Sequence, residues 1–366
     1  MKQLVAILFQ NVPSGVGSHR KDLRLDAKDL REVMSRGASW AVSRGFGSAS
    51  DLDSIEAMGC LSGADPSEVS PRAMERGRSQ IGTLGSGNHF VEIGYVDEIY
   101  DEPTARVLGL EKDSVTVIIH TGSRGLGYQV CDDFIADMIR ASARYGIELP
   151  DRQLCCAPLE SVEGKRYLRA MSAAANYAFV NRQVITEFVR RTFEQVLGMS
   201  PGETRLGVVY DVCHNIAKME DHEVDGVSRR LCVHRKGATR AFPPGHPETP
   251  SAYRGVGQPV LIPGDMGRYS FVLVGTERAH RETFGSTCHG AGRLMSRAAA
   301  RRAGRHRPLV RELEDRGIIV RSEGRMTLLE EMPEAYKDVA RVVDVCERAG
   351  ISRKVARLVP LGVVKG

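Results

Sequence analysis

The chain has 366 residues, of which 42% are hydrophobic and 27% charged, a composition typical of a globular protein and unlike that of a disordered one. This length suits one large or two ordinary domains, and the longest apolar runs fall far short of the roughly 20 residues that a membrane helix needs. The net charge of +5 permits an acidic partner such as nucleic acid without requiring one. Eight scattered cysteines without a C-x-x-C pair, and no apparent signal peptide, favour a cytoplasmic protein over a disulfide framework or a zinc finger.

The order of predicted elements indicates an α+β fold. Residues 1–80 are expected to be mostly helical and polar, with a helix start at Asp65-Pro66. From Ile81 onward, strand-like runs alternate with turns and helices without regular pairing, which favours mixed sheets over a doubly wound fold. We find no internal repeat and no linker that would divide the chain. Strands are expected at 90–93, 115–119, 206–212, 231–233, 260–262 and 269–275, and long helices at 128–145 and 161–197.

Four of the ten histidines lie in short signatures that are rich in glycine or polar residues. Neutral imidazole is a ligand for transition metals and a possible nucleophile, while glycine lets backbone N–H groups approach an anion. The combination predicts a site for metal and phosphate. The signatures are GSGNHF (85–90), HTGSRG (120–125), YDVCHN (210–215) and STCHGAG (286–292).

Three of these histidines are expected at strand ends. The apolar run 115–119 leads directly into His120 and a glycine-rich turn, where Arg124 could add donors for a phosphate. This turn is not a Walker loop, because no Gly-Lys-Ser/Thr follows. His89 and His214 have comparable places, so the three imidazoles could converge on metal. The alternative for each is a hydrogen-bonded structural histidine.

The fourth signature suggests a nucleophile. His289 is followed by Gly290 and Gly292 and then by a predicted helix at 293–301, so we expect it beside a helix N-terminus. An accessible imidazole there could attack a nucleoside triphosphate and form a phosphoramidate. The alternatives are a further metal ligand or a helix cap.

Two loops and one arginine-rich helix could bind anions. The loop 234–246 contains Arg235, Lys236 and Arg240, and the segment 263–270 is a glycine turn between two predicted strands. The arginine-rich region 293–311 is either an exposed helix face or a nucleic-acid contact.

Together with NVPSGVGS (11–18) and the terminal GVVKG (362–366), these signatures resemble those of the RtcB family of GTP- and manganese-dependent RNA ligases of tRNA splicing and RNA repair. The resemblance runs from about Leu4 to the end of the chain. It implies one catalytic domain over 1–366, with a mostly helical part at 1–80 and a sheet-rich part at 81–366. The implied fold is a sandwich-like core of mixed β-sheets with surrounding helices.

The resemblance also implies the site. His89 would bind one Mn²⁺, His120 and His214 would bind the other, and His289 would carry covalent GMP. Arg124, Arg235, Lys236 and Arg240 would then contact RNA. The implied GTP site consists of Asn88, His89, Phe90, Val91, Glu92, His214, Asn215, Pro263, Gly264, Asp265, Met266, Ser270, His289, Gly290, Ala291, Gly292, Tyr336 and Lys365.

The implied reaction joins an RNA 3′-phosphate or 2′,3′-cyclic phosphate end to a 5′-hydroxyl end. Guanylylated His289 would pass GMP to the 3′-phosphate, and the 5′-hydroxyl would then displace it. The resemblance further implies tRNA halves or broken RNA ends as partners, an archease-type activator, a cytoplasmic location and a monomer.

Two features depart from the family pattern. The D-x-N-C-G motif, with its Asp and its metal-bridging Cys, is absent from this sequence, which therefore resembles a family member without its N-terminal segment. Cys213 is not expected to replace that Cys, because adjacent strand residues face opposite sides. Asp265 stands where better-known members carry Ser, and an acidic side chain near phosphates needs a metal or a base beside it.

We therefore expect residues 1–366 alone to bind Mn²⁺ weakly and to ligate RNA poorly or not at all, since too few metal ligands are left. The alternatives are a non-catalytic RNA-binding or partner-binding remnant of such a ligase and a metal-dependent phosphohydrolase.

Overall fold

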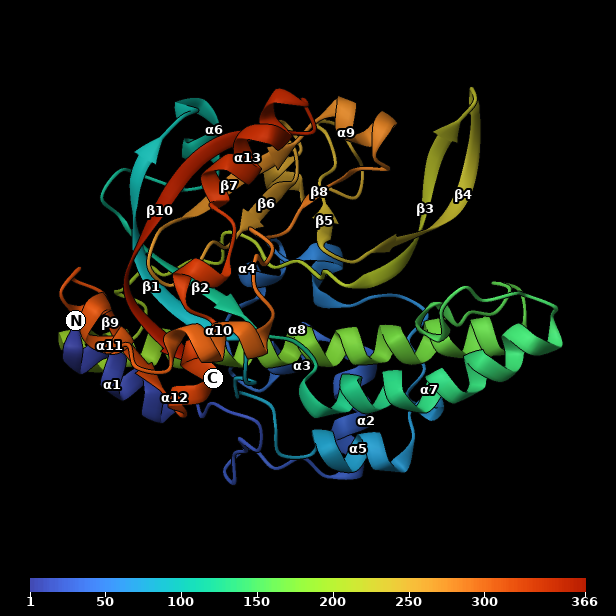
Figure 1. Ribbon diagram of the computed structural model, residues 1–366, viewed down its shortest axis with the longest axis horizontal. Helices are drawn as coiled ribbons and strands as arrows, with labels where there is room; N and C mark the ends of the chain where they lie inside the picture. Colours follow the sequence, from blue (N-terminus) through green and yellow to red (C-terminus); the bar gives the residue numbers. More distant parts are fainter.

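The C-terminal strand β10 (Ser352–Lys365) is the centre of a six-stranded sheet in the computed structural model, which describes all residues 1–366 (Figure 1). Its neighbours are β1 (Phe90–Ile99) on one side and β7 (Ser270–Gly275) on the other, both antiparallel to it. The sheet is completed by β2 (Val115–His120) next to β1, β6 (Pro259–Ile262) next to β7, and β9 (Ile319–Ser322), which runs parallel to the end of β10.

A proline lies within this central strand, where it would normally weaken a sheet. The pairing of β1 with β10 shifts between Ile93 and Gly94, so that Gly94 lies opposite Pro360. Such a bulge accommodates a residue that has no N–H to donate. Gly94 has no Cβ, and a Cβ there would lie 2.5 Å from the carbonyl oxygen of Val359.

The strand register brings three strand ends together. Phe90, the first residue of β1, pairs with His120 at the end of β2 and with Lys365 at the end of β10. Three chain segments far apart in sequence therefore meet at one end of the sheet, where His120 and Lys365 place polar side chains.

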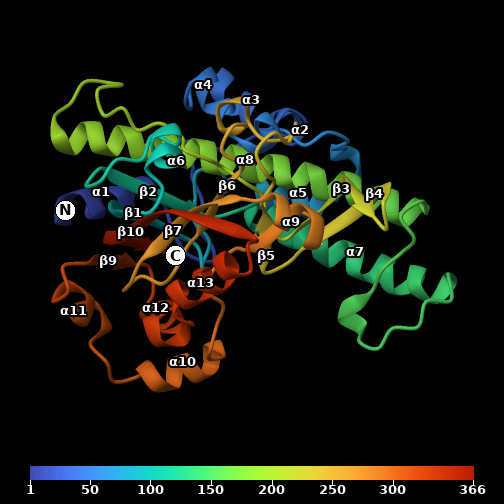
Figure 2. The ribbon, with the colours of Figure 1, turned by 90° about the horizontal axis from the view of Figure 1, so that it is seen from above.

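A layer of helices lies against the sheet, built around the 36-residue helix α8 (Val162–Leu197) (Figures 1 and 2). The Ser161 side chain caps its N-terminus, and Gly198 ends it in a left-handed conformation. α8 is long, but no helix of the structure combines the length and apolarity needed to cross a membrane. The helices that pack with α8 are α1 (Lys2–Asn11), α2 (Ala27–Arg36), α3 (Ala38–Ser43) and α7 (Arg124–Arg144), and α5 (Pro71–Gly77) packs on α7.

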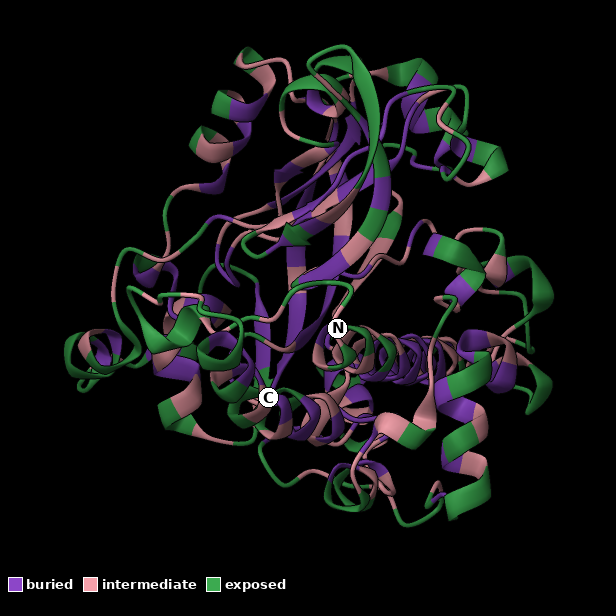
Figure 3. Ribbon diagram, turned by 90° about the vertical axis from the view of Figure 1, so that its right-hand side faces the viewer, coloured by how far each residue is buried: buried purple, intermediate pink, exposed green.

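Shorter elements surround the sheet. The hairpin of β3 (Ile216–Val224) and β4 (Val227–Arg235) projects from the body, and β5 (Ala238–Arg240) pairs with β8 (Ser286–Cys288). Figure 3 shows that buried residues gather along the strands and along α8. The remaining helices are α4 (Ala49–Leu52), α6 (Glu102–Val107), α9 (Glu277–Glu282), α10 (Arg297–Gly304), α11 (Leu309–Glu314), α12 (Arg325–Glu330) and α13 (Val339–Arg348).

The α+β class is confirmed, and most predicted elements are present, but two predictions are wrong. The segment 206–212 is not a strand, since its only sheet-type contact is an isolated bridge between Asp211 and Ile55. The helix expected at 293–301 begins only at Arg297, where the Ser296 side chain caps it. His289 therefore follows strand β8 and does not lie at a helix N-terminus.

Candidate functional site

Three imidazoles from separate segments lie side by side near the converging strand ends. His120 Nε2 and His214 Nε2 are 3.3 Å apart. The ring centroids of His214 and His289 are 4.6 Å apart. His120 ends β2, His214 precedes β3 and His289 follows β8, so the fold brings together three of the four histidine signatures.

The turn after His214 depends on Asn215, whose φ of 57° lies in the left-handed region that asparagine tolerates better than most residues. Behind His214, Cys213 is buried, and burial raises the pKa of its thiol to about 11. Its sulfur faces Arg182, which also pairs with Asp211 at 2.6 Å. Cys213 packs in a hydrophobic cluster with Ile55 and Phe179.

His89 lies slightly apart from this group, with its ring centroid 6.4 Å from that of His120. Its Nδ1 accepts a hydrogen bond from the Gly85 N–H at 2.9 Å and lies 3.2 Å from the Thr121 hydroxyl. A Cβ at Gly85 would lie 2.2 Å from this nitrogen, so glycine is required there. Because Nδ1 is an acceptor, the proton of neutral His89 is assigned to Nε2.

A buried asparagine of α8 ties the two histidine loops together. Asn181 Oδ1 accepts from the N–H groups of Gly82 at 2.8 Å and Thr83 at 3.2 Å. Its Nδ2 donates to the carbonyl oxygens of Thr83 at 3.2 Å and Gly122 at 3.0 Å. The loop that carries His89 and the loop that follows His120 are thus fixed to the same side chain.

The imidazoles are neutral near pH 7, because burial disfavours their charged forms. Burial lowers the pKa of His214 to about 3, and the neighbouring His289 and Arg182 add to this effect. Burial also lowers the pKa of His89 to about 3, with contributions from Arg124 and Lys365. It lowers the pKa values of His120 and His289 as well. Neutral imidazoles can bind metal or act as nucleophiles.

His120 and His214 fit one metal ion, because two nitrogen ligands about 2.1 Å from an ion lie about 3.0 to 3.4 Å apart for angles from 90° to tetrahedral. Their nitrogens are 3.3 Å apart. His89 in the assigned tautomer presents an N–H instead of a lone pair. No group of three or more His, Cys, Asp or Glu side chains in the structure is arranged to hold a metal. Any further ligands of a metal ion held by His120 and His214 would have to come from outside this group of side chains.

A cavity of about 310 Å³ adjoins His289 and is lined by most of the residues implied for GTP. Val91 is not among the lining residues, because it faces the hydrophobic core on the other side of β1. His89, His214 and Asn215 also lie outside the lining. The lining residues from the implied set are Asn88, Phe90, Glu92, Pro263, Gly264, Asp265, Met266, Ser270, His289, Gly290, Ala291, Gly292, Tyr336 and Lys365.

The acidic groups of this cavity differ in how far nearby cations compensate their charge. Arg268 Nε pairs with the buried Asp265 at 2.5 Å, and the Gly267 N–H donates to the same carboxylate at 3.0 Å. Arg268 is thus the positively charged partner that an acidic residue in the turn 263–270 requires. The pKa of Glu92 is raised to about 7, chiefly by burial, with Lys365 opposing the shift and Asp265 adding to it.

Three further lining residues, absent from the set implied for GTP, form a polar network. Arg293 contacts Glu331 at 3.1 Å and the Tyr336 hydroxyl at 3.0 Å. Glu331 also lies 3.6 Å from Lys365 Nζ. Arg297 is the third of these additional lining residues. Arg293 and Arg297 belong to the arginine-rich region 293–311, which was considered for nucleic-acid contact and not for the GTP site, whereas no sequence motif points to Glu331.

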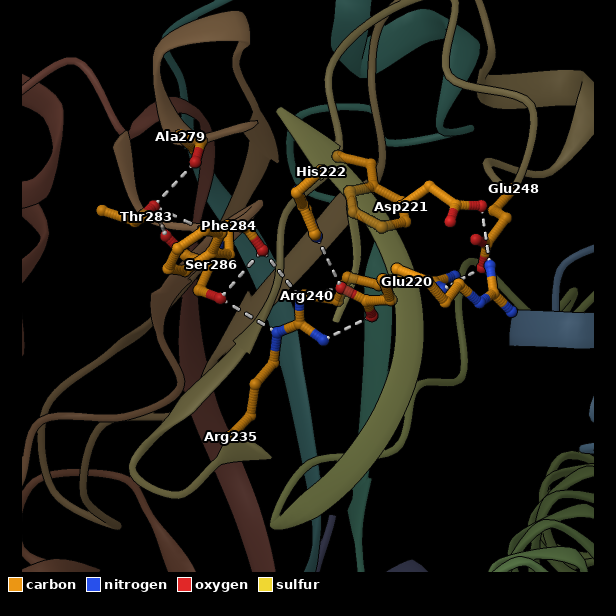
Figure 4. Close-up of polar contacts among 12 residues, drawn as sticks. Glu220, Asp221, His222, Arg235, Arg240, Glu248, Ala279, Thr283, Phe284 and Ser286 are labelled. Atoms are coloured by element: carbon orange, nitrogen blue, oxygen red, sulfur yellow. Dashed lines mark hydrogen bonds and ion pairs between the residues drawn. The ribbon is translucent and has the colours of Figure 1, made fainter. Parts of the chain in front are cut away.

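The arginines predicted to contact RNA are largely engaged inside the protein. Arg235 is buried and pairs with Glu220 at 2.6 and 2.8 Å (Figure 4). Arg240 is also buried and pairs with Glu248 at 2.6 Å and Glu56 at 3.1 Å. Their guanidinium groups are thus occupied by internal ion pairs and are not available as surface contacts.

Arg124 is likewise bonded to the protein, to Thr83 at 3.0 Å and to Ser18 at 2.8 Å. Lys236 differs from the three arginines, since it is exposed and also lines the cavity. The arginine-rich region 293–311 is partly neutralised, because Arg293 pairs with Glu331 and Arg301 with Glu330.

Comparison with known proteins gives one consistent result. The family model described as tRNA-splicing ligase RtcB matches residues 1–366. Proteins named tRNA-splicing ligase RtcB from Archaeoglobus fulgidus and Thermococcus kodakarensis are 57% and 53% identical over the whole chain, which covers 76% of each. A protein of the same name from Methanocaldococcus jannaschii is 52% identical, and the chain spans 38% of its length.

Proposed function

The chain belongs to the tRNA-splicing ligase RtcB family, and we propose that it carries the catalytic core of a GTP- and Mn²⁺-dependent RNA ligase. Such a ligase joins a 3′-phosphate or 2′,3′-cyclic phosphate end to a 5′-hydroxyl end through a guanylylated histidine. We further propose tRNA halves or broken RNA ends as substrates, and a monomeric cytoplasmic protein that works with an archease-type activator.

One observation carries this proposal: His289 lies between two chemically different neighbours. On one side is the 310 Å³ cavity, whose polar lining is suited to a nucleotide. Also beside His289 is the His120–His214 pair, of which His120 lines the cavity too, and the spacing of the pair fits a metal ion. A nucleophile for a metal-assisted attack on a nucleoside triphosphate needs both neighbours.

The residues of the chain have distinct roles in the proposed reaction. Neutral His289 attacks the α-phosphorus of GTP, a P–N bond forms, and pyrophosphate leaves. The RNA 3′-phosphate then attacks the same phosphorus, the P–N bond breaks, and histidine is released. Finally the 5′-hydroxyl attacks the activated 3′-phosphate, a phosphodiester bond forms, and GMP leaves.

Cationic side chains around the cavity would offset the charge that develops on phosphate oxygens. Lys365 and Arg293 lie on its walls, and Lys236 lies where RNA could approach from outside. Manganese held by His120 and His214 would supply Lewis-acid stabilisation of the same charges. Burial keeps His289 unprotonated near pH 7, which a nucleophile requires.

The test is incubation of the protein with α-labelled GTP and Mn²⁺, followed by addition of RNA with matched 3′-phosphate and 5′-hydroxyl ends. Because residues 1–366 alone are expected to bind Mn²⁺ weakly, we expect a low yield of an acid-labile GMP adduct that is absent from His289→Ala, and little or no ligation when the RNA is added. The same labelling is repeated with the A. fulgidus relative, which is longer than this chain. RNA binding without an adduct in either protein would instead favour a non-catalytic remnant, and nucleotide hydrolysis without joining would favour a phosphohydrolase.

A further inference from the structure

One arginine of α8 bonds to the chain segments of both histidines that fit the metal ion. Arg182 Nη1 donates to the Thr121 carbonyl oxygen at 3.2 Å, and Thr121 directly follows His120. Arg182 Nε donates to Asp211 Oδ1 at 2.6 Å, and Asp211 lies three residues before His214. Apart from the two imidazoles, which contact each other, no other side chain bonds to both segments.

The positions of the two imidazoles depend on their backbone. The only side-chain hydrogen-bond contact of either ring is the 3.3 Å contact between His120 Nε2 and His214 Nε2. Histidines that bind metal are usually oriented by a hydrogen bond to the second ring nitrogen. No protein group makes such a bond here, so the separation of the rings follows from how the two segments are held relative to each other.

The two segments have separate supports. The strand β2, which ends at the first histidine, pairs only with β1. The segment before the second histidine bonds to Glu56 instead. The Glu56 N–H donates to the Asp211 carbonyl at 2.9 Å, and the Cys213 N–H donates to the Glu56 carboxylate at 3.0 Å. Arg182 is therefore the side chain that joins two independently supported parts of the site.

The Arg182 side chain is itself well fixed. It is only 11% exposed, and its guanidinium carbon lies 5.0 Å from the centroid of the Phe179 ring. A guanidinium is planar and directs its donors along fixed lines, so it holds two acceptors in a defined relation. A lysine ammonium carries the same charge but does not impose this geometry.

We propose that Arg182 is a positioning residue for the metal ion, which sets the separation of His120 and His214 by holding Thr121 and Asp211 on one guanidinium. Arg182 has this role only if the two histidines hold Mn²⁺, as the proposed function requires. A guanidinium has no lone pair to offer a metal. Its positive charge beside the site disfavours a bound cation, so the contribution of Arg182 is geometric.

The test measures Mn²⁺ binding to residues 1–366 without nucleotide, from the loss of the electron paramagnetic resonance signal of free Mn²⁺. Arg182→Lys keeps the charge but loses the fork of donors, and it should bind Mn²⁺ about tenfold more weakly than the unchanged chain. Arg182→Gln removes the charge. A purely electrostatic role would make this variant bind Mn²⁺ more tightly, whereas the positioning role predicts weaker binding.

Arg190→Lys is the matched control. Arg190 lies on the same helix, and its side chain is 16% exposed. It also joins a carboxylate, that of Asp51 at 2.7 Å, to a backbone carbonyl, that of Leu206 at 2.8 Å. Neither partner is a neighbour in sequence of a site histidine. Arg190→Lys should lose similar stability in urea denaturation, but its Mn²⁺ affinity should be nearly unchanged.

Asp211→Asn breaks the same bridge at its other end. The double variant of Arg182→Lys and Asp211→Asn should bind Mn²⁺ about as weakly as Arg182→Lys alone, because either substitution already removes the bridge. Additive losses would mean that the two residues act independently, which counts against the proposal. If Arg182→Lys does not fold, Asp211→Asn alone is compared with the control, and unchanged affinity overturns the proposal.

Three further results would overturn it: unchanged Mn²⁺ affinity in folded Arg182→Lys, tighter binding by Arg182→Gln, or an equal loss in Arg190→Lys. His214→Ala separates this role from the proposed function. If His214→Ala keeps full Mn²⁺ affinity, the ion is bound elsewhere, and the metal position in the proposed function fails together with the role of Arg182. If His214→Ala loses affinity and Arg182→Lys does not, only the role of Arg182 fails.

Discussion

Replacement of Asn181 by alanine should uncouple the two histidine loops from α8. Asn181 is fully buried and makes four hydrogen bonds, so the substitution leaves two N–H groups and two carbonyl groups without their partner. Each unsatisfied buried group costs about 1 to 3 kcal/mol, and relaxation or entering water recovers part of this cost. We expect the free energy of unfolding to fall by about 3 to 5 kcal/mol.

Asn176→Ala is the matched control for this substitution. Asn176 lies on the same helix, is equally buried, and bonds to Leu61 at 2.7 Å and to Met34 at 2.9 Å. Its partners lie in the N-terminal helical region, away from the histidines. The two variants should lose similar stability, but only Asn181→Ala should change the histidine site.

Two assays separate these effects. Urea denaturation gives the change in unfolding free energy of each variant. Binding of a fluorescent GTP analogue, measured where both variants are folded, should be about tenfold weaker for Asn181→Ala and nearly unchanged for Asn176→Ala. A stability loss below about 1 kcal/mol for Asn181→Ala would refute the hydrogen-bond reasoning. Equal nucleotide binding by the two variants would refute the role of Asn181 in placing the loops.

Three other substitutions test the electrostatics of the structure. Burial alone would raise the pKa of Glu56, but Lys218 and Arg240 lower it to about 2. A lowered carboxyl pKa stabilises the fold above about pH 4.5, and this contribution of about 3 kcal/mol is lost as the pH falls toward 2. The unfolding free energy of Glu56→Gln should therefore depend less on pH between 4.5 and 2, and an unchanged dependence in urea titrations would contradict this. Arg235→Ala should lower the free energy of unfolding in urea by about 3 to 5 kcal/mol, because it removes the guanidinium that pairs with the buried Glu220 carboxylate and leaves His222 in contact with it. Lys236→Ala should keep its thermal stability but bind RNA more weakly with a smaller salt dependence, and normal RNA binding by this variant would exclude Lys236 as a contact.

Local patterns predicted much of the fold. The helix expected at 161–197 is α8, because its apolar positions, serine cap and terminal glycine are all local signals. The 14-residue strand β10 was not predicted, since its sequence mixes charged residues, proline and glycine, and its pairing with β1 and β7 is set by distant segments. The prediction for segment 206–212 was wrong in the opposite sense: a strand was expected and none is present, because strand propensity has no effect without a partner strand.

The site was predictable where glycine and histidine occur together, and less so where it depends on packing. His120 and His214 meet near converging strand ends, as their placement in the sequence suggested. His89 was expected with them but lies slightly apart, and His289 joins them from the end of β8 instead of from a helix N-terminus. The internal ion pair of Arg235 could not be predicted from the sequence. Its partner Glu220 lies on the other strand of the hairpin, opposite Leu231 and four positions along from Arg235, so no local pattern pairs the two charges.

The most direct test of the account is to locate the GMP adduct. After incubation of the protein with GTP and Mn²⁺, proteolysis and mass spectrometry would identify the modified residue. The account predicts a single GMP on the peptide that contains His289, bound to its imidazole. GMP on Lys236 or Lys365, or an unchanged yield of adduct in His289→Ala, would contradict it.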